Sequence, residues 1–246
     1  MKPLTSLLES NRDWAEKISQ NDPQFFETLA QQQAPEYLWI GCSDSRVPAN
    51  EIVGRLPGEL FVHRNVANVV VHTDMNCLSV VQYAVQVLKV KHIMVVGHYG
   101  CGGVQASIDP APHGMIDNWL RNIRNVYNKH KGLLSAWSDS PKEHLDRLCE
   151  LNVIEQALNV CETTIVQEAW ANGQELNVHG WVYGLNDGLI NDLEFNASSP
   201  VEVEEQYRVA LRKIELLGDM MKKDADEETD AKSARSLWGK LNQLFR

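Results

Sequence analysis

Three short apolar runs constrain the fold of this chain more than any other feature. They are rich in β-branched and aromatic residues, and they occupy 37–42 (YLWIGC), 60–65 (LFVHRN) and 92–98 (HIMVVGH). The apolar residues of 75–90, between the second and third runs, recur at helical spacing. Strands that alternate with helices are typical of a parallel sheet covered on its faces. The sequence therefore predicts an α/β fold with a mainly parallel central sheet and flanking helices.

The segments before and after these three runs predict further helices and one more pair of strands. Two helical patterns, over 4–18 and after Asp22-Pro23, indicate an N-terminal helical arm. Ser140 with Glu143 has the form of a capping box, which would open a long helix reaching to about Thr163. Two β-rich segments, ELNVHGWVYG and LINDLEF, flank the turn residues Asn-Asp-Gly, so we expect a hairpin at one edge of the sheet.

A change of composition separates the C-terminus from the rest of the chain. We expect one catalytic domain over 1–222, closed by a helical pattern, and a separate tail over 223–246. The tail begins with the acidic run DADEETD and continues as a basic segment whose apolar residues follow helical spacing. Packing against the protein's own oligomer is the first interpretation of residues 232–246, and docking on a membrane surface or a partner protein is the second.

Charge and cysteine usage exclude some classes of function. The formal charge is −10, from 23 basic and 33 acidic residues, so a nucleic-acid partner is not expected. The start lacks the apolar core of a secretory signal, and we expect a cytoplasmic protein. The five cysteines are scattered and odd in number, which favours reduced thiols and metal ligation over a disulfide framework.

Metal-ligating side chains stand at the ends of two predicted strands. Cys42 and Asp44 lie at and just past the end of the first strand, and His98 and Cys101 lie at and just past the end of the third. Functional sites in open α/β sheets gather at the carboxyl ends of the strands. Two thiolates, an imidazole and a carboxylate form a suitable tetrahedral set for Zn²⁺.

Each motif also has a simpler interpretation when it is taken alone. Cys42 could be a small buried apolar residue, and GHYGCGG could be a phosphate-binding turn, although it lacks the usual glycine spacing and a following Lys-Ser/Thr. A thiol redox protein that uses Cys42 and Cys101 is a further alternative. Two ligand-bearing strand ends in one sheet favour the metal site over these interpretations.

Three motifs together resemble a known family. CSDSRVP (42–48), HRNVAN (63–68) and GHYGCGG (97–103) are similar to those of the β-class carbonic anhydrases, zinc enzymes that interconvert carbon dioxide and bicarbonate. The resemblance covers roughly residues 1–220. It implies one Zn²⁺ per chain, a homodimer or homotetramer, and the zinc ligands Cys42, Asp44, His98 and Cys101.

The resemblance also implies a role for Arg46, which forms a dyad with Asp44 in this family. Four protein ligands would saturate zinc, whereas a catalytic zinc needs an open position. Arg46 offers Asp44 another partner, so that water can take the vacated position and become a hydroxide that attacks carbon dioxide. Because two thiolates donate more charge than neutral imidazoles do, activity is expected to favour alkaline pH.

Further residues match the family's substrate pocket. Phe61 and Tyr83 match apolar wall residues, Gln33 matches a side chain that reaches in from a neighbouring subunit, and Gly102 matches a backbone N–H donor. The substrate is small and apolar, so a pocket with few polar contacts suits it.

Three more residues match one bacterial subgroup of the family. Trp39, Arg64 and Tyr183 correspond to a second bicarbonate site, at which bound anion favours the closed state with Asp44 on zinc. This match predicts allosteric regulation by bicarbonate and pH. The alternative to the enzyme is a non-catalytic zinc or bicarbonate-sensing protein that keeps the same site permanently closed.

Overall fold

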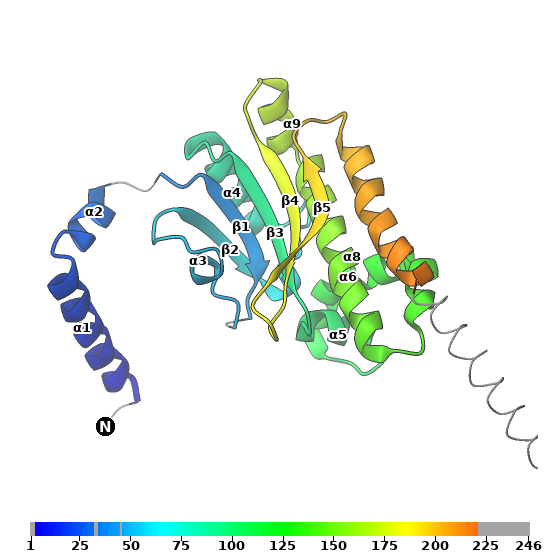
Figure 1. Cartoon of the computed structure of the whole chain (residues 1–246), viewed down its shortest axis with the longest axis horizontal. Coiled ribbons are helices and arrows are strands. Elements are labelled where there is room, and N and C mark those ends of the chain that lie inside the picture. Colours follow the sequence, from blue (N-terminus) through cyan, green and yellow to red (C-terminus); the bar gives the residue numbers. More distant parts are fainter. Residues whose placement is uncertain (1–2, 32–33, 45, 221–246) are drawn as a thin grey trace, which may run out of the picture.

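A five-stranded sheet forms the centre of the molecule (Figure 1). The structure is a computed structural model and describes residues 3–31, 34–44 and 46–220. The strand order is β2-β1-β3-β4-β5, and every neighbouring pair is parallel except the antiparallel pair β4/β5. The bounds of the strands are β1 Tyr37–Cys42, β2 Leu60–Asn65, β3 His92–His98, β4 Asn177–Tyr183 and β5 Ile190–Ala197. The predicted α/β fold, its mainly parallel sheet and its edge hairpin are confirmed.

Helices cover one face of the sheet over most of its area. Alternate strand residues such as Leu38, Ile40, Ile93 and Val95 are fully buried against this helical layer, as period-two alternation requires. The helices after β1 are α3 Ala49–Ile52, α4 Met75–Gln82, α5 Gly102–Ile108, α6 Asp117–Lys129, α7 Lys131–Leu134, α8 Pro141–Glu162, α9 Thr164–Ala171 and a last helix at 203–220. The predicted helix at 75–90 is α4, extended by a wider π-helical turn over Tyr83–Val87.

The other face of the sheet carries a much smaller core. Trp39, Met94 and Val96 point to this face, where they pack with Val47 and Leu60. The two cores therefore differ in size by several-fold within one sheet, and on this second face the helix that packs on the core is the short α3, through Ala49 and Ile52.

The capping box predicted at the start of α8 is wrong. A capping box needs the Ser140 N–H to bind the Glu143 side chain. In the structure the Ser140 N–H instead donates to the Trp137 carbonyl at 3.1 Å, and the Ser140 side chain makes no cap hydrogen bond. The helix still begins at Pro141, because proline is favourable at the first helical position.

The predicted N-terminal arm consists of α1 Pro3–Asn21 and α2 Phe25–Gln31. Figure 1 shows both helices standing apart from the sheet. Their apolar side chains are correspondingly exposed, at 68% for Leu4, 64% for Leu7 and 49% for Trp14. Within the described residues, no helix is both long enough and apolar enough to span a membrane. Gln33 and the predicted tail at 223–246 lie outside the described residues.

Candidate metal centre and its surroundings

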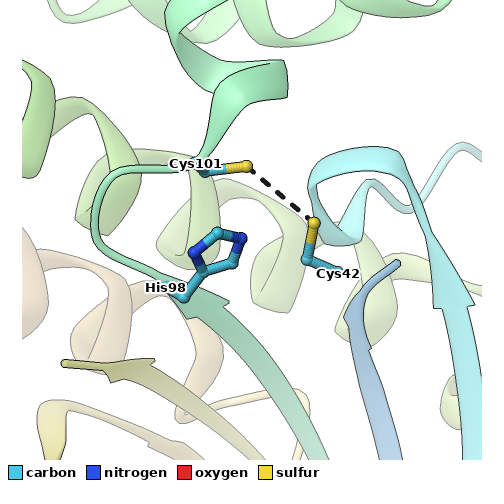
Figure 2. A group of neighbouring side chains, drawn as sticks. All are labelled: Cys42, His98 and Cys101. Atoms are coloured by element: carbon cyan, nitrogen blue, oxygen red, sulfur yellow. Dashed lines mark hydrogen bonds between the residues drawn. The ribbon is translucent and has the colours of Figure 1, made fainter. Parts of the chain in front are cut away.

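Two adjacent strands bring the predicted ligands together. Cys42 is the last residue of β1 and His98 is the last residue of β3, and these strands are parallel neighbours. The chain then turns at Gly100, whose φ of 66° is a left-handed conformation that favours glycine. This turn places Cys101 at the N-cap of α5, facing Cys42. Figure 2 shows the three side chains converging from these elements.

The spacing of the three side chains suits a metal ion. The Sγ atoms of Cys42 and Cys101 are 3.9 Å apart, and the ligand atoms of both cysteines and His98 all lie within 4.8 Å of one another. Two thiolates bound to tetrahedral zinc at about 2.3 Å would be about 3.8 Å apart. All three residues are buried.

His98 supplies a further test of the fit. Its Nδ1 lies 3.0 Å from the Tyr99 carbonyl, which can only accept, so Nδ1 carries the proton and Nε2 presents its lone pair. Nε2 is buried and has no hydrogen-bond partner among the described residues. An orphaned ring nitrogen beside two thiols has the chemistry of a ligand to a thiophilic metal such as zinc.

The two thiols influence each other's ionisation. The hydrogen bond from the Cys101 thiol lowers the pKa of Cys42, and burial opposes this effect. The pKa of Cys101 is raised, because it holds the proton shared with Cys42 and is itself buried. Burial lowers the pKa of His98, but the adjacent Cys42 sulfur and its charge outweigh burial, so that its pKa is raised. Cys42 is therefore the first of the pair to become a thiolate.

Asp44 and Arg46 form a bidentate ion pair at the edge of this group. Arg46 Nη2 lies 2.6 Å from Asp44 Oδ2, and Arg46 Nε lies 3.0 Å from Oδ1. These bonds hold the pKa of Asp44 well below its usual range. Asp44 Oδ2 lies 3.8 Å from His98 Nε2, but Asp44 is not part of the close group of three ligands. The carboxylate is thus beside the metal centre and paired with the guanidinium.

The backbone after β2 also contacts the centre. The Ala67 N–H donates to Cys42 Sγ at 3.4 Å, and Ala67 has a left-handed φ of 64° although it is not glycine. Sequence reasoning did not identify this donor, because neither the residue type nor its spacing marks it. The only signal in the sequence is its place inside HRNVAN, one of the three motifs.

Comparison with known proteins decides the family. A family model described as carbonic anhydrase matches residues 37–190. Over 190 residues the chain is 53% identical to a carbonic anhydrase of Emericella nidulans, covering 77% of this chain and 83% of that protein. The chain belongs to the β-class carbonic anhydrase family. Its activity is accordingly the hydration of carbon dioxide, and the family is one of zinc enzymes.

Solved structures agree with this assignment. The β-carbonic anhydrase of Coccomyxa, solved in complex with acetazolamide, is 40% identical with a TM-score of 0.78, covering 83% of this chain and 92% of that one. A tetrameric β-carbonic anhydrase from Sordaria macrospora is 39% identical with a TM-score of 0.75, covering 80% of this chain and all of that one (100%). The predicted family is confirmed, whereas the predicted bacterial subgroup stays a prediction.

The predicted pocket residues of this β-carbonic anhydrase are not gathered around its own metal centre. Phe61 and Tyr83 lie together, with ring centroids 5.7 Å apart. Phe61 pairs with Leu38, four residues before Cys42 along β1, which places it about 13 Å down the sheet. Gly102, the first residue of α5, does lie next to Cys101.

The predicted regulatory residues surround the small core on the second face. Trp39 is fully buried there, its indole Nε1 has no hydrogen-bond partner in the described chain, and Tyr183 packs against the same cluster. The Arg64 guanidinium donates to the carbonyl oxygens of Cys42, at 2.9 Å, and of Val47. Arg64 therefore links this region to the backbone of a predicted metal ligand.

Proposed function

We propose that this chain converts carbon dioxide and water reversibly into bicarbonate and a proton with one Zn²⁺, and that Asp44 exchanges between the metal and Arg46. The observation that carries the proposal is the arrangement of the site. A buried group of two thiols and an orphaned imidazole nitrogen lies beside a carboxylate already paired with an arginine. The proposed reaction is inferred from the similarity of the sequence to carbonic anhydrases.

Cys42, His98 and Cys101 would hold the zinc in this proposal. When bound, zinc supplies a Lewis acid that brings the pKa of water from about 15.7 toward roughly 7. The hydrogen bond of His98 to the Tyr99 carbonyl fixes the ring, so that Nε2 keeps facing the two thiolates.

Asp44 would act as an acceptor in the open state. Arg46 keeps the carboxylate ionised and holds both of its oxygens, with Oδ2 facing the edge of the ligand group. An ionised carboxylate at this place would accept a hydrogen bond from the attacking water and orient its lone pair. If the carboxylate left Arg46 and became a ligand to the zinc, it would close the site to water.

A second subunit would complete the substrate pocket. Phe61 and Tyr83 lie too far from their own metal centre to line it, and Tyr83 is 44% exposed. We therefore assign them, with Gln33, to the centre of a neighbouring subunit, while the Gly102 N–H serves its own centre. The detached arm of α1 and α2, with its exposed apolar residues, supports assembly into a dimer or tetramer.

The site at Trp39, Arg64 and Tyr183 would bind bicarbonate as a regulator. The indole N–H of Trp39, which has no partner among the described residues, and the guanidinium of Arg64 are donors suited to an anion, and Tyr183 adds a hydroxyl group. Bound anion would favour the closed state through its preference for that state over the open one.

The remaining proposals concern organisation and location. We propose that residues 1–222 are one catalytic domain with an N-terminal arm, and that residues 223–246 are an acidic linker and a basic amphipathic tail outside the catalytic chemistry. We propose a cytoplasmic location, because all five cysteines are free in the structure, as expected in a reducing compartment.

Stopped-flow measurement of carbon dioxide hydration tests the proposed function. The zinc-loaded protein should accelerate hydration, increasingly so at alkaline pH, and removal of the metal by a chelator should abolish the acceleration. Readdition of zinc should restore it. A zinc-loaded protein that binds bicarbonate but hydrates no faster than free zinc would instead be the non-catalytic binding protein.

A further inference from the structure

The turn after β2 has an unusual backbone that touches the metal centre. Ala67 and Asn68 both have left-handed φ angles, 64° and 48°, and neither is glycine. Residues persist in such conformations only when their surroundings over-determine them. The consequence of this conformation is that the Ala67 N–H points at Cys42 Sγ, at a distance of 3.4 Å.

Three amide side chains of α8 hold this turn. Asn152, Gln156 and Asn159 lie on one face of the helix, because they are spaced by four and three residues. Asn152 Nδ2 donates to the Ala67 carbonyl at 3.0 Å, and Gln156 Oε1 accepts from the Val70 N–H at 2.8 Å. Asn159 Nδ2 donates to the Val70 carbonyl at 2.9 Å. Polar residues on a helix face usually meet water, but Asn152 is only 1% exposed and Gln156 only 2%.

A further hydrogen bond joins these side chains into a ladder and fixes their directions. Gln156 must turn its oxygen to the Val70 N–H, so its nitrogen faces Asn152 and donates to Oδ1 at 3.1 Å. Asn152 is then left with its nitrogen toward the Ala67 carbonyl. Only one orientation of each amide satisfies every donor and acceptor.

Other side chains fasten the two ends of the turn. Trp119 Nε1 donates to the Val66 carbonyl at 2.8 Å, and the Asn65 amide bonds both the N–H and the carbonyl of Val69. The turn also lies against Gly103, where an added Cβ would come within 3.2 Å of the Ala67 Cβ. Helix α8 differs from these contacts, because its Asn152 side chain bonds the carbonyl of Ala67 directly.

We propose that Asn152 and Gln156 are positioning residues for the thiolate of Cys42. They hold the left-handed turn in place, so that the Ala67 N–H donates to the sulfur and stabilises its negative charge. Hydrogen bonds to a ligand atom orient it and tune its donation to a metal. The inference rests on the proposed role of Cys42 as a metal ligand.

A pair of matched variants tests this inference. Gln156→Met breaks the ladder with little change in volume. Gln167→Met is the control, because Gln167 Nε2 donates to the Cys161 carbonyl at 2.7 Å, a half-buried side-chain amide bond that does not involve the turn. Cobalt(II) replaces zinc in each purified variant, and the thiolate-to-cobalt absorption band is recorded. The release of zinc from each zinc-loaded protein to a chelator is measured separately.

The expected result is specific to the ladder. Loss of the N–H donor raises the energy of the sulfur lone pair, so the band of Gln156→Met should move to longer wavelength, and its zinc should leave about 10-fold to 100-fold faster. Gln167→Met should match the wild type in both measurements. An unchanged band and release rate in a folded Gln156→Met protein would overturn the proposal.

Two further variants keep the test decisive. If Gln156→Met does not fold, Asn159→Leu at the more exposed end of the ladder should still move the band in the same direction by a smaller amount, and an unmoved band there would overturn the proposal. The variant Cys42→Ser tests separately the premise that Cys42 is a metal ligand. If Cys42→Ser kept full zinc, the proposed metal site would fail, whatever the ladder variants showed.

Discussion

The two halves of the candidate centre differ in exposure and in how firmly they are held. Cys42, His98 and Cys101 are buried, and hydrogen bonds with the backbone or with one another fix them. The side chains of Asp44 and Arg46 are 20% and 62% exposed, and they hold chiefly each other. An exposed ion pair contributes only about 0–1 kcal/mol, whereas zinc binding by a structural site contributes about 10–16 kcal/mol. The carboxylate can therefore change partners at little cost, while the buried ligands cannot.

The largest effect is expected from variants that remove one of the three buried ligands. Cys42→Ser, His98→Ala and Cys101→Ser should each lose zinc and hydration activity together, because each removes a ligand that stays bound throughout turnover. Metal analysis after gel filtration, combined with stopped-flow assays, checks this. Any one of these variants that retained full zinc at normal affinity would show that the residue is not a ligand.

A smaller effect should come from the second face of the sheet. Tyr183→Phe should weaken bicarbonate inhibition at low pH by about tenfold, the value of one hydrogen bond to a charged group, with zinc content unchanged. Inhibition curves measured across pH provide the test, and Arg64→Ala serves as the companion variant. Unchanged inhibition in both variants would exclude this region as the regulator.

Stability at low pH should depend on Glu155, a residue outside the metal centre. Burial alone would raise the pKa of Glu155, but hydrogen bonds from His130, Tyr207 and Lys129 outweigh burial and lower it from 4.5 to about 2. Stability from this lowered pKa is present above about 4.5 and is lost as the pH falls toward 2.

The variant Glu155→Gln tests this effect. It should be less stable than the wild type near neutral pH by up to about 3 kcal/mol, and the difference should shrink between pH 4.5 and 2. Urea unfolding at pH 6 and pH 2.5 measures both values. A difference that stays constant across this range would show that the carboxylate's ionisation does not stabilise the fold.

The smallest effect on the centre is expected from the tail. Removal of residues 231–246 should leave zinc content and hydration unchanged, because every proposed ligand, dyad and pocket residue lies before position 184. Light scattering shows whether the oligomer changes, and co-sedimentation with vesicles tests the membrane alternative. Loss of zinc in the truncated protein would place the tail inside the catalytic unit.

Much of the fold and the three buried ligands follow from local sequence. Cys42 and His98 each end an apolar run, and parallel strands place such ends side by side. The ladder on α8 could not be predicted in this way. Asn152 and Gln156 look like a solvent-facing stripe, but in the structure both are buried, and Asn152 bonds the turn at Ala67. The capping box at Ser140 failed for a similar reason, because the Trp137 carbonyl competes for its N–H.

The variant Arg46→Ala tests the central claim most directly, because it changes the exposed half alone. Without its partner, Asp44 should bind the metal and close the site, so the purified protein should hold one zinc per chain yet hydrate carbon dioxide at least about 100-fold more slowly, as expected for a lost positioning group. Zinc content and stopped-flow hydration are measured on the same sample. Full zinc with a wild-type hydration rate would contradict the account, because Asp44 would then need no second partner.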